Sequence, residues 1–213
     1  GINKLTALQT LDCSQNNLTA LAGIANLTAL QTLDCSQNNL TALTGIEKFT
    51  VLQTLNCANN SSLKDLSSII ELNELQNLNI SGNKLSVLPN LSKLTALELL
   101  DCSKNYLKDC SQLSSLSSLQ TLYCSYNKIT DVSPLQKLRM LQVLDCSNNN
   151  ILKQFSSLTT LTTLQVLNCS YNLFDSEEES ANILLDVASL KNLHHFTCVG
   201  CNITSILGLD VLP

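Results

Sequence analysis

The sequence predicts an α/β repeat solenoid, a curved, right-handed coil of chain with a parallel β-sheet on its concave face and mostly 3-10 or extended segments on its convex face. Three observations predict it. One pattern, L-x-x-L-x-C-x-x-N-x-L, recurs about every 22 residues, and a fixed period of this length is typical of solenoids. Inside the pattern, apolar and polar residues alternate as they do in a strand. Between two copies, apolar residues fall at every third position, a tighter spacing than that of an α-helix.

Successive copies of the pattern mark the repeats. Leu30 to Leu40 is the clearest copy, and Leu8 to Leu18 is almost identical to it. In a solenoid each repeat contacts only its neighbours, so the whole chain forms one elongated body. We therefore expect residues 1–213 to be a single domain of about nine repeats. The copies begin at Leu8, Leu30, Leu52, Leu75, Leu97, Leu119, Leu141, Leu164 and Leu193.

Both ends of the chain fall at a boundary between repeats. Gly1-Ile2 aligns with Gly45-Ile46, and Leu207-Gly208-Leu209 matches the same place in a repeat that stops unfinished. Terminal repeats of a solenoid need a polar outer face, and the sequence shows no such cap at either end. We therefore expect the chain to be a piece of a longer protein, and its uncapped ends could also self-associate.

Each copy contains a short predicted strand. In the second copy, Leu33 to Ser36 alternates between apolar and polar residues, so its side chains point by turns into the core and out of it. Successive strands must run parallel and stack into one sheet. The concave face of this sheet is then expected to show three columns of side chains. They start at Thr10, Asp12 and Ser14 and continue through the equivalent residues of later repeats.

An asparagine follows most of the strands, as Asn38 does in the second copy. A turn at this point leaves backbone N–H and C=O groups facing inward, and one buried amide side chain can bond to both kinds of group. We therefore expect a ladder of buried amides that closes the turns. Its other members are Asn16, Asn60, Asn83, Asn105, Asn127, Asn149 and Asn172.

The return half of a repeat keeps the three-residue spacing of apolar residues, which predicts 3-10 turns or extended segments and a gentle curve. The second repeat shows it with Leu40, Leu43, Ile46, Phe49 and Leu52. The eighth repeat is longer, and its Ser176-Glu-Glu-Glu179 has the form of a helix capping box. Ile183, Leu184, Val187 and Leu190 follow at helical spacing. The sequence therefore predicts one α-helix there, from about Glu177 to Ser189.

Most of the 10 cysteines occupy one position of the repeat. There they replace an apolar core residue, and Ile80 takes the same position in the fourth repeat. Cysteine serves as a small buried hydrophobic residue in such a place. In-register parallel strands hold neighbouring Cβ atoms farther apart than a disulfide prefers, so we expect a ladder of reduced thiols. Its members are Cys13, Cys35, Cys57, Cys102, Cys124, Cys146, Cys169 and Cys198.

A repeat of 22 residues with this strand, turn asparagine and three-residue spacing resembles the leucine-rich repeats of bacterial internalins and of a eukaryotic phosphatase regulator. The D-C-S-x-N variant of the pattern looks bacterial. The resemblance implies a protein on the bacterial surface or secreted, which binds another protein, for instance one of a host. Reduced buried thiols are also compatible with the cytoplasm.

Several function classes find no support in the sequence. Charged residues make up only 14% of the chain, the net charge is −5, and Lys and Arg form no run, so nucleic acid and anionic membranes are poor partners. No apolar stretch is long enough to span a membrane. The two histidines, His194 and His195, leave no Ser-His-Asp set, and no phosphate-binding motif occurs. We therefore predict a non-enzymatic protein without a cofactor.

Cys198-Val-Gly-Cys201 has the C-x-x-C form of a redox pair or of half a zinc site. On the repeat, however, Cys198 is the strand cysteine and Cys201 takes the place of the turn asparagine, so both should point inward. His195 should face the concave surface and His194 its rim. A zinc site needs about four converging ligands, and the sequence therefore predicts no metal site.

The concave surface changes character from the fifth repeat onward. All 4 tyrosines of the chain fall at exposed positions there, and exposed aromatic clusters are typical of binding sites because tyrosine offers contact area at low entropic cost. Two lysines and two aspartates lie beside them. The predicted partner-binding residues are Tyr106, Tyr123, Tyr126, Tyr171, Asp101, Asp145, Lys104 and Lys128.

The sequence thus predicts a protein-interaction module that binds a partner protein on its concave face around Tyr123 and Tyr126. Two alternatives stay open. The chain could be the recognition arm of a larger secreted bacterial effector enzyme, or a surface protein that binds carbohydrate through its tyrosines.

Overall fold

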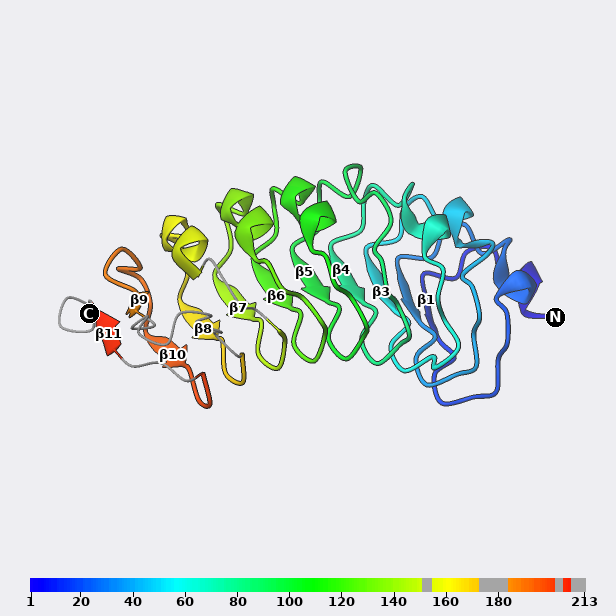
Figure 1. The fold of residues 1–213 in the computed structure, drawn as a ribbon. Coiled ribbons are helices and arrows are strands. Elements are labelled where there is room, and N and C mark those ends of the chain that lie inside the picture. Colours follow the sequence, from blue (N-terminus) through cyan, green and yellow to red (C-terminus); the bar gives the residue numbers. More distant parts are fainter. Residues whose placement is uncertain (151–154, 173–183, 202–204, 208–213) are drawn as a thin grey trace.

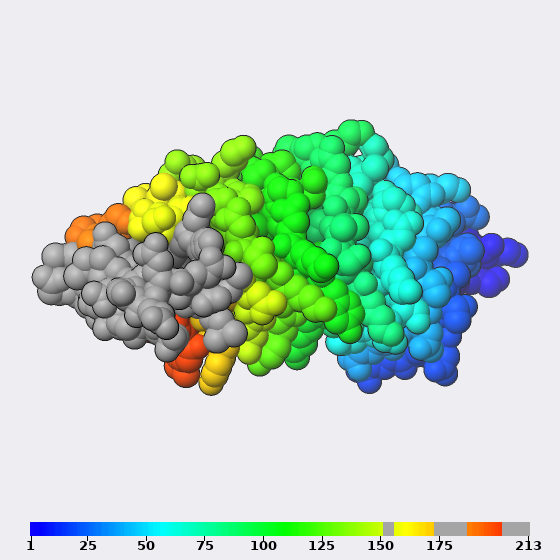
Figure 2. Space-filling view, in the orientation of Figure 1, coloured from blue at the N-terminus to red at the C-terminus, as the bar shows by residue number. Residues whose placement is uncertain are grey.

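The computed structural model is an elongated coil in which the repeats follow one another from the N-terminal to the C-terminal end (Figure 1). The structure describes residues 1–150, 155–172, 184–201 and 205–207. Nine strands form one parallel sheet in the order β1 to β8 and then β10. The space-filling view shows the repeats closely packed side by side along one body (Figure 2). The predicted leucine-rich-repeat solenoid with a parallel sheet is confirmed.

The strands of this sheet are three residues long and lie in register without a slip. Each pairs with the equivalent three residues of the next repeat. Their bounds are β1 (Thr10–Asp12), β2 (Thr32–Asp34), β3 (Thr54–Asn56), β4 (Asn77–Asn79), β5 (Leu99–Asp101), β6 (Thr121–Tyr123), β7 (Val143–Asp145), β8 (Val166–Asn168) and β10 (His195–Thr197). The first two predicted columns are therefore continuous from the first repeat to the last.

The third predicted column is wrong over most of its length. Ser36, Ser103 and Ser147 were expected on the concave surface, but all three are buried. Ser14 and Ser81 are half-buried, and Val199 is exposed. The strand ends two residues earlier, at Asp34 in the second repeat, and the chain then bends inward because the residue after the serine adopts a positive φ, as Gln37 does at 53°. The period-two alternation ends with the strand, so the serine lies beneath the surface rather than on it.

Short 3-10 helices occupy the return side of the coil and gather along the upper side of Figure 1. This confirms the prediction from the three-residue spacing, since Phe49 N–H, for example, donates to the carbonyl of Ile46 at 2.9 Å. The bounds are η1 (Ile2–Lys4), η2 (Ala22–Ile24), η3 (Ile46–Lys48), η4 (Ser67–Ile69), η5 (Ser111–Ser115), η6 (Ser133–Lys137) and η7 (Phe155–Thr160).

The α-helix predicted from Glu177 to Ser189 does not form over its second half. Its first half, 177–183, lies outside the described residues. Strand β9 (Leu184–Asp186) follows and pairs in parallel with β11 (Ser205–Leu207) in a separate two-stranded sheet. Leu184, Val187 and Leu190 satisfy the three-residue spacing as well as the helical one. The chain takes the former, and Leu190 N–H donates to the carbonyl of Val187 at 2.9 Å.

Leucine and cysteine side chains fill the space between the sheet and the return segments. Leu33, Cys35, Phe49 and Leu52 of the second repeat are fully buried. The amide ladder lies beside this core, and Asn38 is one of its buried members. All 10 cysteines are free thiols. No helix in the part of the chain that the structure describes is long and apolar enough to cross a membrane.

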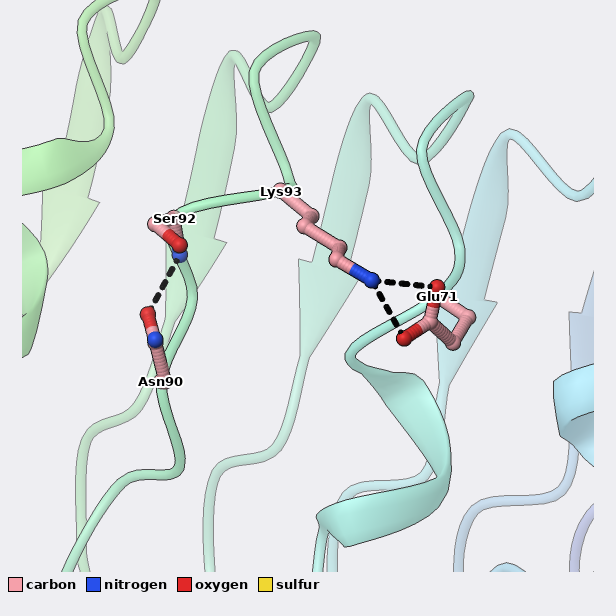
Figure 3. Close-up of polar contacts among 4 residues, drawn as sticks. All are labelled: Glu71, Asn90, Ser92 and Lys93. Carbon is pink, nitrogen blue, oxygen red and sulfur yellow. Dashed lines mark hydrogen bonds and ion pairs between the residues drawn. The ribbon is translucent and has the colours of Figure 1, made fainter.

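One exposed ion pair joins neighbouring return segments. Lys93 Nζ lies 2.6 Å from a carboxylate oxygen of Glu71, and Ser92 N–H donates to Asn90 Oδ1 at 3.0 Å in the same segment (Figure 3). Exposed pairs of this kind contribute about 0–1 kcal/mol. The apolar core and the amide ladder, rather than surface charge, therefore hold the repeats together.

Candidate binding surface

The second column of the sheet has a structural task in most repeats. Asp34 Oδ1 accepts the backbone N–H of Ser36 at 2.9 Å and its hydroxyl at 2.6 Å. Asp101 makes the same two bonds to Ser103, at 3.0 and 2.6 Å. An aspartate or asparagine here satisfies the first N–H after the strand, as in an Asx turn. The equivalent residues that accept this N–H are Asp12, Asn56, Asn79, Asp145 and Asn168.

Tyr123 interrupts this series. It lies in β6 between Asp101 and Asp145 in the register of the sheet, and 37% of its surface is exposed. A phenol ring carries no oxygen close to the backbone, so it cannot accept the N–H of Ser125 as an aspartate would. The sixth repeat therefore gives up a turn-closing hydrogen bond to present an aromatic ring. Departures from a local rule of this kind concentrate at functional or strained positions.

Tyr126 and Tyr171 occupy a second shared position, at which the residue has a positive φ in every repeat of the nine-stranded sheet. Their φ angles are 54° and 56°, in the left-handed region that costs most L residues about 1–2 kcal/mol. Gly82 and Gly200 take the same place in other repeats, with φ angles of 66° and 65°. A methyl group added at Gly200 would lie 2.8 Å from Cδ1 of Tyr171. The Tyr171 ring therefore leans over the glycine of the next repeat.

Tyr106 lies in the turn after β5 and carries a neighbour from the next repeat. Lys128 Nζ is 5.2 Å from the centre of its ring, which is within cation–π range. Tyr106 and Lys128 are both exposed, and so is Lys104. The ammonium group of Lys128 thus lies over one face of the ring, and both side chains stay exposed to a partner.

Three of the four predicted site tyrosines lie in adjacent repeats, and the fourth lies farther along the chain. Tyr106, Tyr123 and Tyr126 belong to the adjacent fifth and sixth repeats, whereas Tyr171 lies in the eighth. Asn148 of the seventh repeat takes the equivalent position between Tyr126 and Tyr171. At a strand spacing of about 4.8 Å, two repeats separate these last two tyrosines by about 10 Å. A partner of ordinary size can touch both.

Asp101 and Asp145 lie half-exposed on either side of Tyr123. Each uses one carboxylate oxygen for its own turn, toward Ser103 and Ser147 at 3.0 Å. The backbone N–H of the turn thus occupies one oxygen of each group, and the other oxygen remains for a partner. Asn56 shows how that second oxygen can be used, since its amide donates to Asp34 Oδ2 at 2.8 Å.

Sequence reasoning missed one exposed lysine of this region. Lys84 follows β4 at the position that Tyr106 and Lys128 hold in the next two repeats. Its signal was present in the sequence as the residue directly after the turn asparagine Asn83.

The buried thiols of the ladder offer no reactive site. Burial raises the pKa of Cys57 and of Cys110 to about 12, so neither forms a thiolate near neutral pH. Cys169 has a raised pKa through its hydrogen bond with Cys201 and through burial. Cys201 donates its S–H to the carbonyl of Cys169 at 3.1 Å. The turn asparagine Asn172 donates in the same way to Cys146, at 3.0 Å, so Cys201 replaces an amide of the ladder.

We expect the folded protein to react with a thiol reagent at only two cysteines at pH 8. Cys13 and Cys198 are half-buried, whereas the other cysteines are buried. Burial raises the pKa of the buried ladder thiols such as Cys57, which makes them inert. The hydrogen bond with Cys169 lowers the pKa of Cys201, but burial closes this thiol to the reagent. Mass spectrometry after brief alkylation would count the modified sites. All 10 cysteines should react in denaturant. Alkylation of Cys57 or Cys124 in the folded state would contradict the closed core.

Within the described ranges, no group of three or more His, Cys, Asp or Glu side chains is placed to hold a metal ion. Cys201 is buried, whereas His194 and His195 are exposed. The two kinds of ligand therefore do not converge around the C-x-x-C motif.

Comparisons with known proteins agree with this architecture. The family described as Leucine Rich repeats (2 copies) matches residues 6–48, 28–71 and 117–160, and the family described as Leucine Rich Repeat matches 74–94. Together these ranges cover more than half of the chain. None of the curated protein sequences matches it significantly.

Solved structures of internalins are similar along most of their length. Internalin C2 of Listeria monocytogenes is 32% identical, with a TM-score of 0.72, over 77% of this chain and 72% of that one. Internalin F of the same organism is 22% identical, with a TM-score of 0.61, over 100% of this chain and 74% of that one.

The ectodomain of an Arabidopsis thaliana receptor kinase, GASSHO1/SCHENGEN3, shares the fold at 22% identity and a TM-score of 0.78 over 95% of this chain, which spans only 25% of that ectodomain. Leucine-rich-repeat domains are in general non-catalytic modules for protein interaction. The present chain belongs to the leucine-rich-repeat family and is an internalin-like member of it.

Proposed function

We propose that this domain binds a partner protein on its concave face, with Tyr123 and Tyr126 at the centre of the contact. The observation that carries the proposal is the replacement at Tyr123. Most other repeats use this position to close a turn, whereas the sixth repeat exposes a ring there. Tyr126 stands three residues later at a left-handed position. The left-handed backbone is common to the repeats, so the exchange of a turn-closing side chain for an exposed ring at Tyr123 is what sets the sixth repeat apart from its neighbours.

The chemistry of the neighbours fits a protein partner. Tyrosine is enriched among the residues that dominate the energy of protein interfaces. Asp101 and Asp145 flank the centre on the sheet, and Lys104 and Lys128 flank it on the turns. Groups of both signs around an aromatic centre resemble the polar rim of such an interface.

The similar structures support the same kind of partner. The Arabidopsis ectodomain was solved with CASPARIAN STRIP INTEGRITY FACTOR 2, and one further leucine-rich-repeat protein, TLR13, was solved with a single-stranded RNA. The net charge of −5 and the aspartates of the second column disfavour a nucleic acid here. A bacterial origin and a place on the cell surface or outside the cell follow from the internalin likeness as part of this proposal.

Photo-cross-linking would test the proposal directly. With benzoylphenylalanine in place of Tyr123, we expect a covalent adduct with the partner, because that side chain lies inside the contact. The matched control carries the same group in place of Met140, which is exposed after η6 on the return side. If the variant with the group at position 140 forms the adduct and the variant with the group at position 123 does not, the partner does not bind on the concave face. An adduct with glycan instead of polypeptide would favour the carbohydrate alternative.

A further inference from the structure

Lysine and tyrosine alternate along the turns that follow β4, β5 and β6. Lys84, Tyr106 and Lys128 occupy one position in three successive repeats. Their backbone N–H groups donate to the carbonyls of Leu63, Leu85 and Leu107 at 3.3, 2.8 and 2.8 Å. The same bond in each repeat keeps these residues in register, so they form a straight row. All three side chains are exposed.

A second row runs beside the first. Lys104 and Tyr126 hold the left-handed position in successive repeats, with φ angles of 53° and 54°. Their N–H groups donate to the carbonyls of Ser125 and Ser147 at 2.8 and 3.0 Å. Lys104 and Tyr106 are two residues apart, as are Tyr126 and Lys128. The two rows therefore place a lysine beside a tyrosine in both repeats, and we call these five residues the turn ridge: Lys84, Lys104, Tyr106, Tyr126 and Lys128.

The lysines of the turn ridge have no carboxylate partner within the described part of the chain. The ion pair found there is that of Lys93 with Glu71, and none of Lys84, Lys104 and Lys128 lies within 4.0 Å of an acidic oxygen. Lys128 contacts the ring of Tyr106 instead. Three lysine ammonium groups without an acidic partner thus stand close together on a protein whose net charge is −5.

The acidic residues next to the ridge are already bonded within their own repeats. Asp101 accepts the hydroxyl of Ser103 at 2.6 Å. Asp109 and Asp131, on the return side of the ridge, accept the hydroxyls of Ser111 and Ser133 at 2.6 and 2.7 Å. These bonds hold the carboxylates at their own turns, and among the described residues none of these carboxylates forms an ion pair with a ridge lysine.

We propose that the turn ridge binds an acidic, extended segment of the partner protein. The inference rests on the proposed function and names the chemistry of the partner. Lys84 and Lys128 are two repeats apart, about 9.6 Å at the strand spacing. A polyproline II segment rises about 3.1 Å per residue and presents every third side chain on one face, about 9.3 Å apart. Carboxylates at every third residue therefore match these two lysines.

The aromatic rings complete the match. Prolines of a polyproline II segment dock against exposed aromatic rings, and Tyr106 lies between the two lysines of its row. The aspartates of the sheet, Asp101 and Asp145, border the ridge on the concave side and repel a densely charged polyanion. Spaced carboxylates with apolar residues between them fit better than a sulfated polysaccharide does.

A synthetic peptide would test the inference with the whole domain. The probe is a fluorescein-labelled peptide of four Glu-Pro-Pro repeats, followed by fluorescence anisotropy. Wild type should bind it, and K84Q/K104Q/K128Q should bind about tenfold more weakly, as expected for three exposed charge contacts. The control K4Q/K48Q/K137Q removes the same charge from η1, η3 and η6 and should bind within about twofold of wild type.

Equal losses in the two lysine variants would show an effect of net charge alone and would overturn the inference. So would equal binding of a Gln-Pro-Pro peptide, or tighter binding of a heparin fragment than of the glutamate peptide. The cross-link at position 123 reports on the concave contact separately. If the adduct forms there but the glutamate peptide does not bind, the proposed function stands and the acidic segment is excluded.

Discussion

Replacing Asn38 by alanine is expected to lower the free energy of unfolding by about 3 kcal/mol, whereas Asn39→Ala should change it by less than about 0.5 kcal/mol. Asn38 is buried and accepts the N–H of Leu18 at 2.9 Å. Its amide donates to the carbonyls of Cys13 and Cys35 at 3.0 and 3.1 Å. Alanine leaves these inward-facing groups without partners. Asn39 is exposed, so its side chain has no comparable bonds to lose.

Urea denaturation followed by circular dichroism would compare the two variants. Both variants replace asparagine by alanine at adjacent residues. The effect of this replacement on the unfolded state is therefore nearly the same in both, and it cancels when the two are compared. The midpoint should shift for Asn38→Ala alone. Equal midpoints would mean that water replaces the amide without loss, and that the ladder adds little to the cohesion of the repeats.

The double substitution Tyr123→Asn and Tyr126→Asn should weaken partner binding by about 100-fold, the loss expected for two central interface residues. The same change should raise the free energy of unfolding by about 1 kcal/mol. Asparagine at 123 can accept the N–H of Ser125, as Asn79 accepts that of Ser81 at 3.0 Å. Asparagine at 126 tolerates the left-handed backbone better than tyrosine does.

Affinity and stability must move in opposite directions for this prediction to hold. Affinity would be measured by calorimetry with the partner that the cross-link identifies, and stability by thermal unfolding. Thr32→Ala in β2 is a distant control for binding on the same face. Gln37→Asn is the control for stability, because it places asparagine at another left-handed position, with a φ of 53°, outside the proposed binding surface. A variant that binds poorly because it is less stable would instead show that the tyrosines support the fold.

Much of the fold could be predicted because the repeat forces every copy into one geometry. Leu33, Cys35 and Asn38 recur in phase, so their burial and the in-register sheet follow from the period alone. The serine column failed because the turn after the strand depends on a positive φ at Gln37. Glutamine gives no sequence signal for that conformation, whereas Gly82 at the equivalent position would have given one.

The helix predicted in the eighth repeat was wrong for another reason. Leu184, Val187 and Leu190 fit a helix and a 3-10 return segment equally well, and only the neighbouring repeats decide between them. The exposure of the four tyrosines was predictable, since their place in the repeat defines it. The row of Lys84, Tyr106 and Lys128 follows from the repeat register as well, since each residue comes directly after a turn asparagine, and the backbone bonds between turns confirm the alignment.

The hydrogen bonds of the sheet have a mechanical consequence. They run from repeat to repeat, as in the bond from Cys35 N–H to the carbonyl of Asn56 at 2.8 Å, and so they lie along the axis of the coil. Tension applied between the two ends opens these bonds one repeat at a time instead of loading them all in shear. Each released repeat frees about 70 Å of chain. A domain of this kind unfolds under tension in small steps of about one repeat each. A partner bound across the fifth and sixth repeats would make these two repeats unfold together.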